Sequence, residues 1–292
     1  MLTEEMYSQQ INLLKEQIDE LKYGLYVDSY PMSLLELVNL YLEGDINLKA
    51  EYQRIFKWTQ DQKTKFIESL FLGLPIPPIF LYQDENAMWE VVDGIQRLST
   101  IFEFFGKLKL DGDEINKFHP PFKLTKAPKL THLENLEFNI FPDELKREFR
   151  KLKLDLIIIS KKSGQEVKLE IFRRLNGFGT KLNPQELRNA LILLANSDFF
   201  KLVDRLSNYS PFLNCFEFND EQIRDKKHYE YVIRYLILRD KNFLLSFPTT
   251  NNTKLDDLFD HCIINIIESN SINIYEEETL FKTIFSFLNS TL

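Results

Sequence analysis

The chain has little cysteine and no long apolar run. Its two cysteines, Cys215 and Cys262, lie far apart and match no metal-binding spacing. We expect both to be reduced thiols, because disulfides are rare in the cytosol. No run of apolar residues is long enough to span a bilayer, and the chain does not open on a signal peptide. These features predict a cytoplasmic protein with no membrane partner.

Basic residues are outnumbered by acidic ones, and the imbalance is uneven along the chain. The net charge is −8, with −9 over residues 1–106, +6 over residues 107–188 and −5 over residues 189–292. The negative total argues against nonspecific DNA binding by the whole chain, because its long-range field repels a polyanion. Residues 107–188 are the region that suits contact with DNA.

The stretch WEVVDGIQRLSTIFEFF, residues 89–105, carries the strongest pattern. Trp89 to Val92 predict a buried strand, and Asp93-Gly94 ends it. Apolar residues then recur at intervals of three and four, which predicts a helix that begins at Ile95 and ends before Gly106. A strand, a glycine turn and a helix N-terminus bring backbone N–H groups together, and this arrangement favours anions, phosphate above all.

Three polar side chains stand on this turn. Asp93, Gln96 and Arg97 supply a carboxylate, an amide and a guanidinium. Such a set can hold a metal ion, position a water molecule and clamp a phosphate. A simpler reading is also open, because Asp93 and Arg97 are four residues apart and can form a plain ion pair at the start of a helix.

Elsewhere the patterns predict a mixed N-terminal part and a helical C-terminal part. Helices are expected at 3–22, 33–42, 59–72, 164–175 and 184–195, strands at 79–82, 88–92 and 154–160, and a glycine loop at 176–179. After that the sequence predicts helices at 198–207, 220–240, 254–268 and 276–290. The first helix is either a packing arm or an oligomer contact.

Four motifs, in this order and spacing, match a known family. They are Tyr52-Gln53-Arg54 with Trp58, the segment Leu74–Pro78, Asp93–Arg97, and the stretch from Leu175 to Leu187. Over roughly residues 28–195 the chain resembles the N-terminal domain of GmrSD-type, modification-dependent restriction systems. This is the ParB/sulfiredoxin-like "DGQQR" family, which also occurs in sensors of phosphorothioate-modified DNA.

The resemblance implies an α+β fold, with a ParB/sulfiredoxin-like small mixed sheet and helices, followed here by an all-helical C-terminal region. We accordingly expect an N-terminal helical arm at residues 1–27, the DGQQR domain at 28–195 and a helical domain at 196–292.

The resemblance also implies binding and hydrolysis of a nucleoside triphosphate with Mg²⁺, coupled to control of DNA cleavage. Carried over by position, Asp93, Gln96 and Arg97 would be catalytic, and Asp93 would bind the metal. The remaining residues of the nucleotide pocket would be Tyr52, Gln53, Arg54, Gly94, Asn176 and Gly179. The motifs do not distinguish GTP, ATP and CTP.

The chain departs from the family pattern at three points. Ile95 replaces the first glutamine of DGQQR, which weakens hydrolysis if that amide contacts nucleotide or water and costs nothing if the side chain only packs. Phe178 precedes Gly179 where a small residue is usual, so it either narrows the loop or offers a stacking face. The four histidines, His119, His132, His228 and His261, are well separated, which argues against an internal HNH-type nuclease.

These features favour a nucleotide-hydrolysing regulatory or sensor protein of a DNA restriction or anti-phage defence system. The alternatives are a module that binds nucleotide or modified DNA without turnover, and a ParB-like enzyme that nicks DNA. The expected partners are a nucleotide, modified DNA through residues 107–188, a separate nuclease subunit and a second copy of the chain. Two charged sets are read either as solvated helix faces or as polyanion contacts: Lys146, Arg147, Arg150, Lys151 and Lys153; and Lys168, Arg173 and Arg174. For the charged segment 222–239, which holds Arg224, Asp225, Lys226 and Arg234, the resemblance allows an arginine that faces the pocket.

Overall fold

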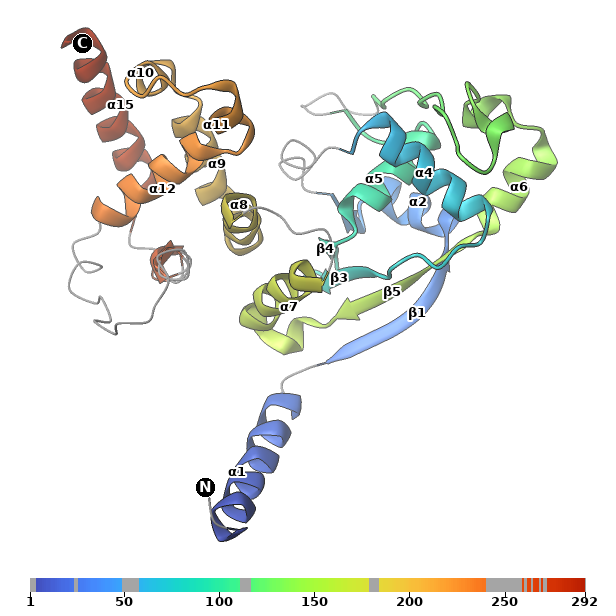
Figure 1. The fold of residues 1–292 in the computed structure, drawn as a ribbon, viewed down its shortest axis with the longest axis horizontal. Helices are drawn as coiled ribbons and strands as arrows, with labels where there is room; N and C mark the ends of the chain where they lie inside the picture. The colour runs from blue at the N-terminus through green and yellow to red at the C-terminus, as the bar shows by residue number, and fades with distance from the viewer. Residues whose placement is uncertain are drawn as a thin grey trace. The chain divides into compact units, whose positions relative to one another are not determined.

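The chain divides into two compact units, residues 1–168 and 169–292 (Figure 1). The structure is a computed structural model, and it describes residues 4–23, 26–48, 58–110, 117–178, 184–239 and 272–291, with positions 259, 262–263, 265–267 and 269. The boundaries predicted near residues 27 and 195 stay predictions.

A five-stranded mixed sheet forms the framework of the first unit. Its strands are β1 (Val27–Ser33), β2 (Ile46–Asn47), β3 (Ile79–Gln83), β4 (Trp89–Asp93) and β5 (Lys153–Ile159), in the order β1-β5-β3-β4-β2. The pairs β1–β5 and β3–β4 are antiparallel, while β3–β5 and β2–β4 are parallel. The predicted hairpin is β3–β4, and the predicted strand at 154–160 is β5.

Helices α2, α4 and α5 gather on one face of this sheet (Figure 1). The helices of the first unit are α1 (Glu4–Tyr23), α2 (Leu34–Glu43), α4 (Gln60–Phe71), α5 (Ile95–Phe104), α6 (Asp143–Lys151) and the start of α7 (Gly164–Phe178). Short 3₁₀ helices lie at Thr131–Leu133, Phe138–Ile140 and Lys161–Ser163.

Local capping signals set the ends of these helices. Ser33 caps α2 by accepting a hydrogen bond from the Glu36 N–H at 3.2 Å, and Gly44 ends that helix in the left-handed conformation. Thr59 and Gln62 form a reciprocal capping box at the start of α4. The predicted boundaries of both helices are therefore confirmed.

Alternate residues of the strands face the main core. Ile79 and Leu81 of β3 and Leu156 of β5 are fully buried and join a cluster with α2, α4 and α5. Phe104 at the end of α5 lies at its aromatic centre, 5.4 Å from Phe122 and 5.5 Å from Phe149 between ring centroids. The helix that follows the Asp93–Arg97 turn is thus anchored in the core, which fixes the position of the turn.

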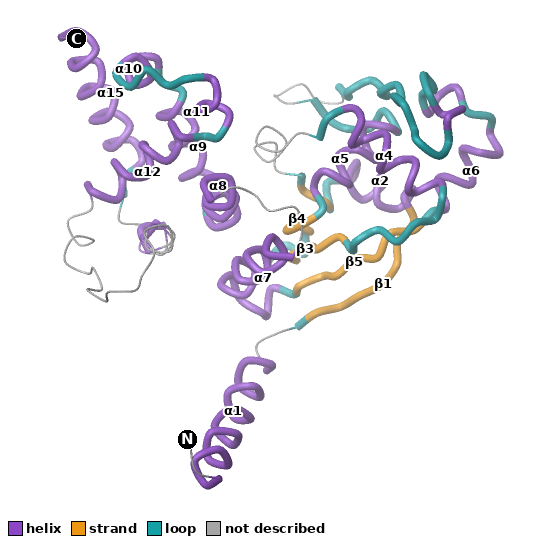
Figure 2. The backbone as a smooth tube through the Cα atoms, viewed as in Figure 1, coloured by secondary structure: helices purple, strands orange, loops and turns teal. Residues whose placement is uncertain are grey.

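In the described residues of the second unit, helices joined by turns and loops make up the regular structure (Figure 2). Its helices are α8 (Pro184–Ala195), α9 (Ser197–Ser207), α10 (Ser210–Asn214), α11 (Asp220–Arg224), α12 (Lys227–Arg239) and α15 (Ile274–Thr291). α9 packs against α8, α12 and α15. The prediction of a single helix at 220–240 is wrong. The helix is interrupted at Asp225–Lys226, where Lys226 has φ +60°.

The predicted α+β class is confirmed. A mixed sheet with helices is followed by a helical C-terminal region, as the sequence indicates. Among the described residues, none of the helices is both long and apolar enough to cross a membrane.

Candidate functional site

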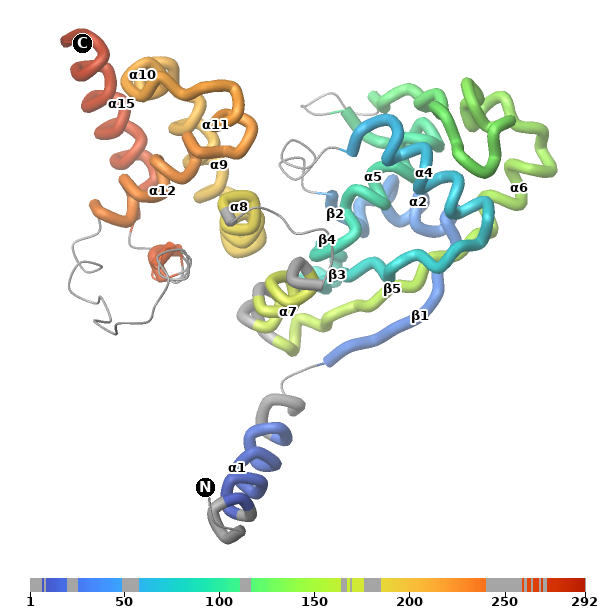
Figure 3. Tube along the Cα trace, in the orientation of Figure 1, coloured from blue at the N-terminus to red at the C-terminus, as the bar shows by residue number. Residues whose placement is uncertain are grey.

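The predicted strand, glycine turn and helix are all present at residues 89–104. β4 ends at Asp93, Gly94 adopts φ +96°, and α5 begins at Ile95, so that the strand leads directly into the helix (Figure 3). Gly94 is the N-cap residue of α5, and it has no side chain that could accept a hydrogen bond from the first helical turn. The positive end of the helix dipole therefore lies beside Asp93 without a side-chain cap.

Gly94 is required for two reasons. Its positive φ is costly for a residue with a side chain. In addition, a Cβ atom at this position would overlap Cδ1 of Ile79 and lie 3.2 Å from Nη2 of Arg97. Because Gly94 has no side chain, the Arg97 guanidinium can lie close to the backbone of the turn.

Arg97 is held by three acceptors within the first unit. Its guanidinium donates to Asp93 Oδ2, to the Pro77 carbonyl and, at 3.2 Å, to the Pro78 carbonyl. The side chain is 11% exposed. Burial lowers the pKa of Arg97, and the neighbouring Asp93 carboxylate opposes that shift. The arginine stays charged and fixes the orientation of Asp93.

Asp93 is the accessible member of the pair. Its side chain is 41% exposed, and one carboxylate oxygen accepts from Arg97. In the described part of the chain, the other oxygen has no hydrogen-bond partner. The simple ion pair that the spacing allows is therefore formed, and it leaves one carboxylate oxygen available at the start of α5.

Gln96 connects the turn to the segment that precedes α4. Its side-chain oxygen accepts a hydrogen bond from the backbone N–H of Trp58 at 3.0 Å. The Trp58 ring in turn packs edge-on against Phe66 of α4, with 5.4 Å between ring centroids. Gln96 thus holds the end of the Tyr52–Trp58 motif next to the turn.

Ile95 packs against the hydrophobic core of the first unit and is half buried. The replacement of glutamine by Ile95 was expected either to weaken hydrolysis or to serve packing alone. The structure supports the packing role.

The structure describes only some of the predicted site residues. Asp93, Gly94, Gln96 and Arg97 lie together on one turn. Tyr52, Gln53, Arg54 and Gly179 lie outside the described residues, so their assignment stays a prediction.

The glycine loop predicted at 176–179 is wrong for its first three residues. Asn176 to Phe178 form the last turn of α7, which extends beyond the predicted end at Leu175. A glycine inside a helix costs only about 1 kcal/mol relative to alanine, so Gly177 does not end α7. Asn176 is thus a helical residue, and its predicted contact with nucleotide stays untested.

Sequence reasoning missed a buried charge pair on the other face of the sheet. Lys168 of α7 is 2% exposed, forms a salt bridge with Glu90 of β4, and lies 4.9 Å from the ring centroid of Tyr82. Neither of the two readings given for Lys168, a solvated face or a polyanion contact shared with Arg173 and Arg174, therefore holds for this residue. The two arginines are exposed, and Arg174 pairs with Glu170 at 2.6 Å.

The chain matches one known protein family over a segment that includes this turn. Residues 34–193 match the family described as the GmrSD restriction endonuclease, N-terminal domain. This match covers more than half of the 292 residues. The chain belongs to the GmrSD N-terminal domain family. It is accordingly a protein of a restriction or defence system. No curated protein and no solved structure matches it.

The GmrSD match covers most of the first unit and the start of the second. It starts at Leu34, the first residue of α2, and ends at Leu193 within α8. The Asp93–Arg97 turn lies inside the match, whereas α1 and the helices from α9 onward lie outside it.

This GmrSD-family chain has no preformed metal cluster among its described residues, since no three His, Cys, Asp or Glu side chains converge there.

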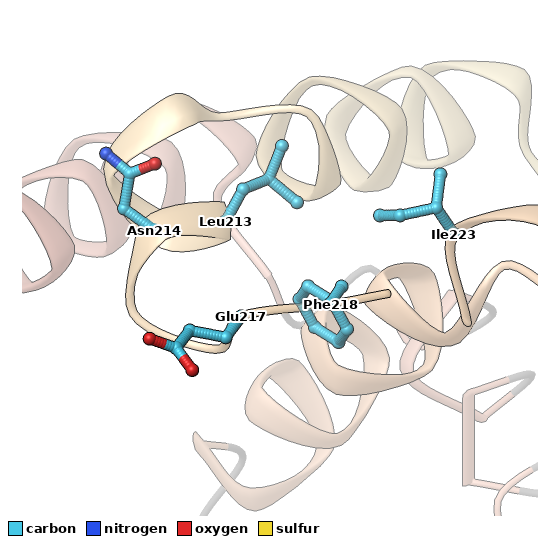
Figure 4. Close-up of a pocket in the computed structure, with 5 residues that line it drawn as sticks. All are labelled: Leu213, Asn214, Glu217, Phe218 and Ile223. Atoms are coloured by element: carbon cyan, nitrogen blue, oxygen red, sulfur yellow. The ribbon is translucent and has the colours of Figure 1, made fainter. Parts of the chain in front are cut away.

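An open pocket of about 510 Å³ lies in the second unit, lined by Leu213, Asn214, Glu217, Phe218 and Ile223 (Figure 4). None of the predicted site residues lines it, so this pocket gives no support to the predicted nucleotide site.

Proposed function

We propose that this chain binds a nucleoside triphosphate at the Asp93–Arg97 turn and hydrolyses it as the regulatory part of a restriction system. The main support is the accessibility and the orientation of the Asp93 carboxylate. This carboxylate is accessible, is oriented by Arg97 through one oxygen, and has a second oxygen without a partner in the described residues.

The phosphates would lie against the first turn of α5. Gly94 supplies no side-chain cap, so the backbone N–H groups at this helix start suit a phosphate oxygen. Arg97 already donates to Asp93 and to the Pro77 and Pro78 carbonyls. Its role in the proposal is therefore to position Asp93 and to add positive charge close to the phosphates, rather than to reach out to them.

The residues present fit a magnesium ion that arrives with the nucleotide. Mg²⁺ is commonly bound through one or two carboxylates together with substrate phosphates and water, so the single accessible carboxylate of Asp93 is sufficient on the protein side. The ion would neutralise part of the negative charge on the phosphates. In that arrangement Asp93 would hold the ion or orient the attacking water, and the Gln96 amide would assist it.

Isothermal titration with ATP, GTP, CTP and UTP in the presence of Mg²⁺ tests the binding step. We expect at least one nucleotide to bind and Asp93→Asn to weaken that binding at least tenfold, about 1.4 kcal/mol. Asp84→Asn is the matched control, because Asp84 is a second half-buried carboxylate, at the β3–β4 turn. Binding of no nucleotide, or equal effects of the two substitutions, would remove the proposal.

Phosphate release separates hydrolysis from binding without turnover. The packing of Ile95 against the core favours an intact hydrolytic site. We therefore expect release of phosphate by the parent chain and its loss in Asp93→Asn. Binding without release, with a gain of release in Ile95→Gln, would favour the non-hydrolysing module instead. Plasmid nicking by the purified chain that disappears in Asp93→Asn would favour the ParB-like alternative.

A second part of the proposal is contact with DNA through α6 and the start of β5. Arg147, Arg150, Lys151 and Lys153 are exposed there, and none of them pairs with a carboxylate in the portion of the chain that is described. Arg150 also lies 5.8 Å from the ring centroid of Phe138. Exposed cations without a carboxylate partner suit phosphate groups of DNA. Nucleotide turnover would then alter DNA engagement or a separate nuclease by shifting the helical unit.

Fluorescence anisotropy with modified and unmodified duplexes tests this contact. Arg147→Gln with Arg150→Gln should weaken DNA binding and reduce its salt dependence by about one to two released counterions. Arg174→Gln, which removes an exposed arginine already paired with Glu170, should change binding less. No binding of either duplex would remove this part of the proposal.

A further inference from the structure

The first helix, α1, exposes an apolar stripe that the described part of the chain does not cover. Tyr7, Ile11, Leu14 and Ile18 are between 39% and 52% exposed, although all four are large hydrophobic residues. They follow one another at spacings of four, three and four residues. This alternation is the heptad pattern that brings apolar side chains to one line along a helix.

The residue types in this stripe are those of a two-stranded coiled coil. If Ile11 and Ile18 occupy heptad position a, Leu14 occupies position d, with Tyr7 one heptad before it. Isoleucine at a with leucine at d favours a parallel dimer over higher oligomers. From this pattern we propose that α1 pairs in parallel, in register, with α1 of a second copy of this chain.

The flanking charges select the parallel orientation. In this register Lys15 occupies position e, and Gln10 and Gln17 occupy position g. A parallel pair sets each g residue against an e residue of the other helix, so that glutamine faces lysine. An antiparallel pair would set e against e and bring lysines together, which like-charge repulsion disfavours.

The same charges argue against a lipid surface as the occupant of the stripe. Residues 4–23 contain five acidic and two basic side chains. Helices that lie on membranes are instead rich in Lys and Arg on their polar face and are attracted to anionic lipids. A second copy of α1 fits the stripe better than a membrane does.

Two adjacent leucines supply a matched test of the stripe. Leu14 is 51% and Leu13 is 56% exposed, but only Leu14 lies at a core heptad position. By sedimentation equilibrium of the full chain, we expect a species of twice the 34.7 kDa chain mass. Leu14→Asp should raise the dimer dissociation constant by on the order of a hundredfold, because both helices lose a core leucine. Leu13→Asp should leave the dissociation constant within about threefold of the parent.

A cysteine placed at position 7 reports the orientation. In a parallel pair Tyr7→Cys faces its equivalent and should form a reducible dimer on mild oxidation. In an antiparallel pair that places Ile18 opposite Tyr7, the two sites would be roughly 16 Å apart along the axis. Gln9→Cys, on the outer face, is the control, and the parent gives the background from Cys215 and Cys262.

Three results would overturn the proposal. One is a parent chain that stays monomeric at tens of micromolar, and another is a trimer or larger assembly. The third is an equal response of the Leu13 and Leu14 variants, or of the two cysteine variants. Each variant should keep the unfolding midpoint of the parent's folded units, since α1 side chains at these positions are exposed.

Discussion

The side-chain oxygen of Gln96 accepts a hydrogen bond from the backbone N–H of Trp58, 38 residues earlier in the chain, at 3.0 Å. This bond joins two of the motifs that carry the family resemblance. It fixes the end of the Tyr52–Trp58 segment beside the start of α5. The two motifs are therefore physically coupled, whatever ligand they bind.

Gln96→Ala should release this connection. The Trp58 N–H would lose its acceptor, so we expect its hydrogen exchange to accelerate at least tenfold and the chain to lose about 1 kcal/mol of stability. Gln96→Glu, which keeps an acceptor oxygen, should preserve more of the Trp58 protection. The N–H of Thr59, which donates to Gln62 at 2.8 Å, is an internal reference that should not change. Unaltered exchange at Trp58 in Gln96→Ala would contradict the role assigned to this bond.

Gly94→Ala should destabilise the chain more than Gly44→Ala. The two glycines have nearly the same φ, +96° and +95°, so both substitutions carry a similar backbone cost of about 1 kcal/mol. Only at Gly94 would the new Cβ overlap Ile79, whereas nothing lies within 4 Å at Gly44. We expect an additional loss of about 1–3 kcal/mol for Gly94→Ala in urea denaturation. Equal losses at the two positions would show that the overlap is relieved at little cost.

The Asp93–Arg97 pair should be more strongly coupled than an exposed pair with the same spacing. Glu170 and Arg174 have the same four-residue spacing, both within α7, but their side chains are 50% and 73% exposed. Because Arg97 is largely buried and its partner is fixed, a double-mutant cycle should give about 1–2 kcal/mol for Asp93–Arg97 and about 0.3–0.5 kcal/mol for Glu170–Arg174. Urea denaturation of each single and double alanine variant measures both energies, and similar values would argue against a positioning role for Arg97.

The sequence predicted the features that depend on neighbouring residues. The capping box of Thr59 and Gln62, the stop at Gly44 and the turn at Asp93-Gly94 are all local, and each was correctly placed. Their physical cause lies within a few residues, so the sequence alone is sufficient to identify them.

The partners of the charged side chains could not be predicted in the same way. Arg97 donates to the carbonyls of Pro77 and Pro78, which precede it by 20 and 19 residues across the β3–β4 hairpin. Lys168 pairs with Glu90 from 78 residues away. These contacts follow from the order of the strands, which no local pattern specifies. The break between α11 and α12 falls at Asp225–Lys226 in a run of charged residues, and neither Gly nor Pro marks it.

His228 should make the stability of the chain depend on pH. The imidazole is 3% exposed, and its Nδ1 atom has no hydrogen-bond partner among the described residues. The pKa of His228 is lowered to about 4, chiefly by burial and in smaller part by nearby Lys226, while Asp204 opposes the shift. The folded chain therefore binds fewer protons at this site than the unfolded chain, in which the pKa is about 6.5.

Because the unfolded state binds the additional proton, stability should fall as the pH is lowered from about 6.5 toward 4 and should be insensitive to His228 above that window. Between pH 6.5 and pH 5 we expect a loss of about 1–2 kcal/mol from this group. Urea midpoints across the range should show a smaller pH dependence for His228→Gln than for the parent chain. His132→Gln, at an exposed position, is the control and should retain the parent's slope. An unchanged slope in His228→Gln would mean that the buried imidazole accepts its proton without unfolding, through local opening of the α12 region.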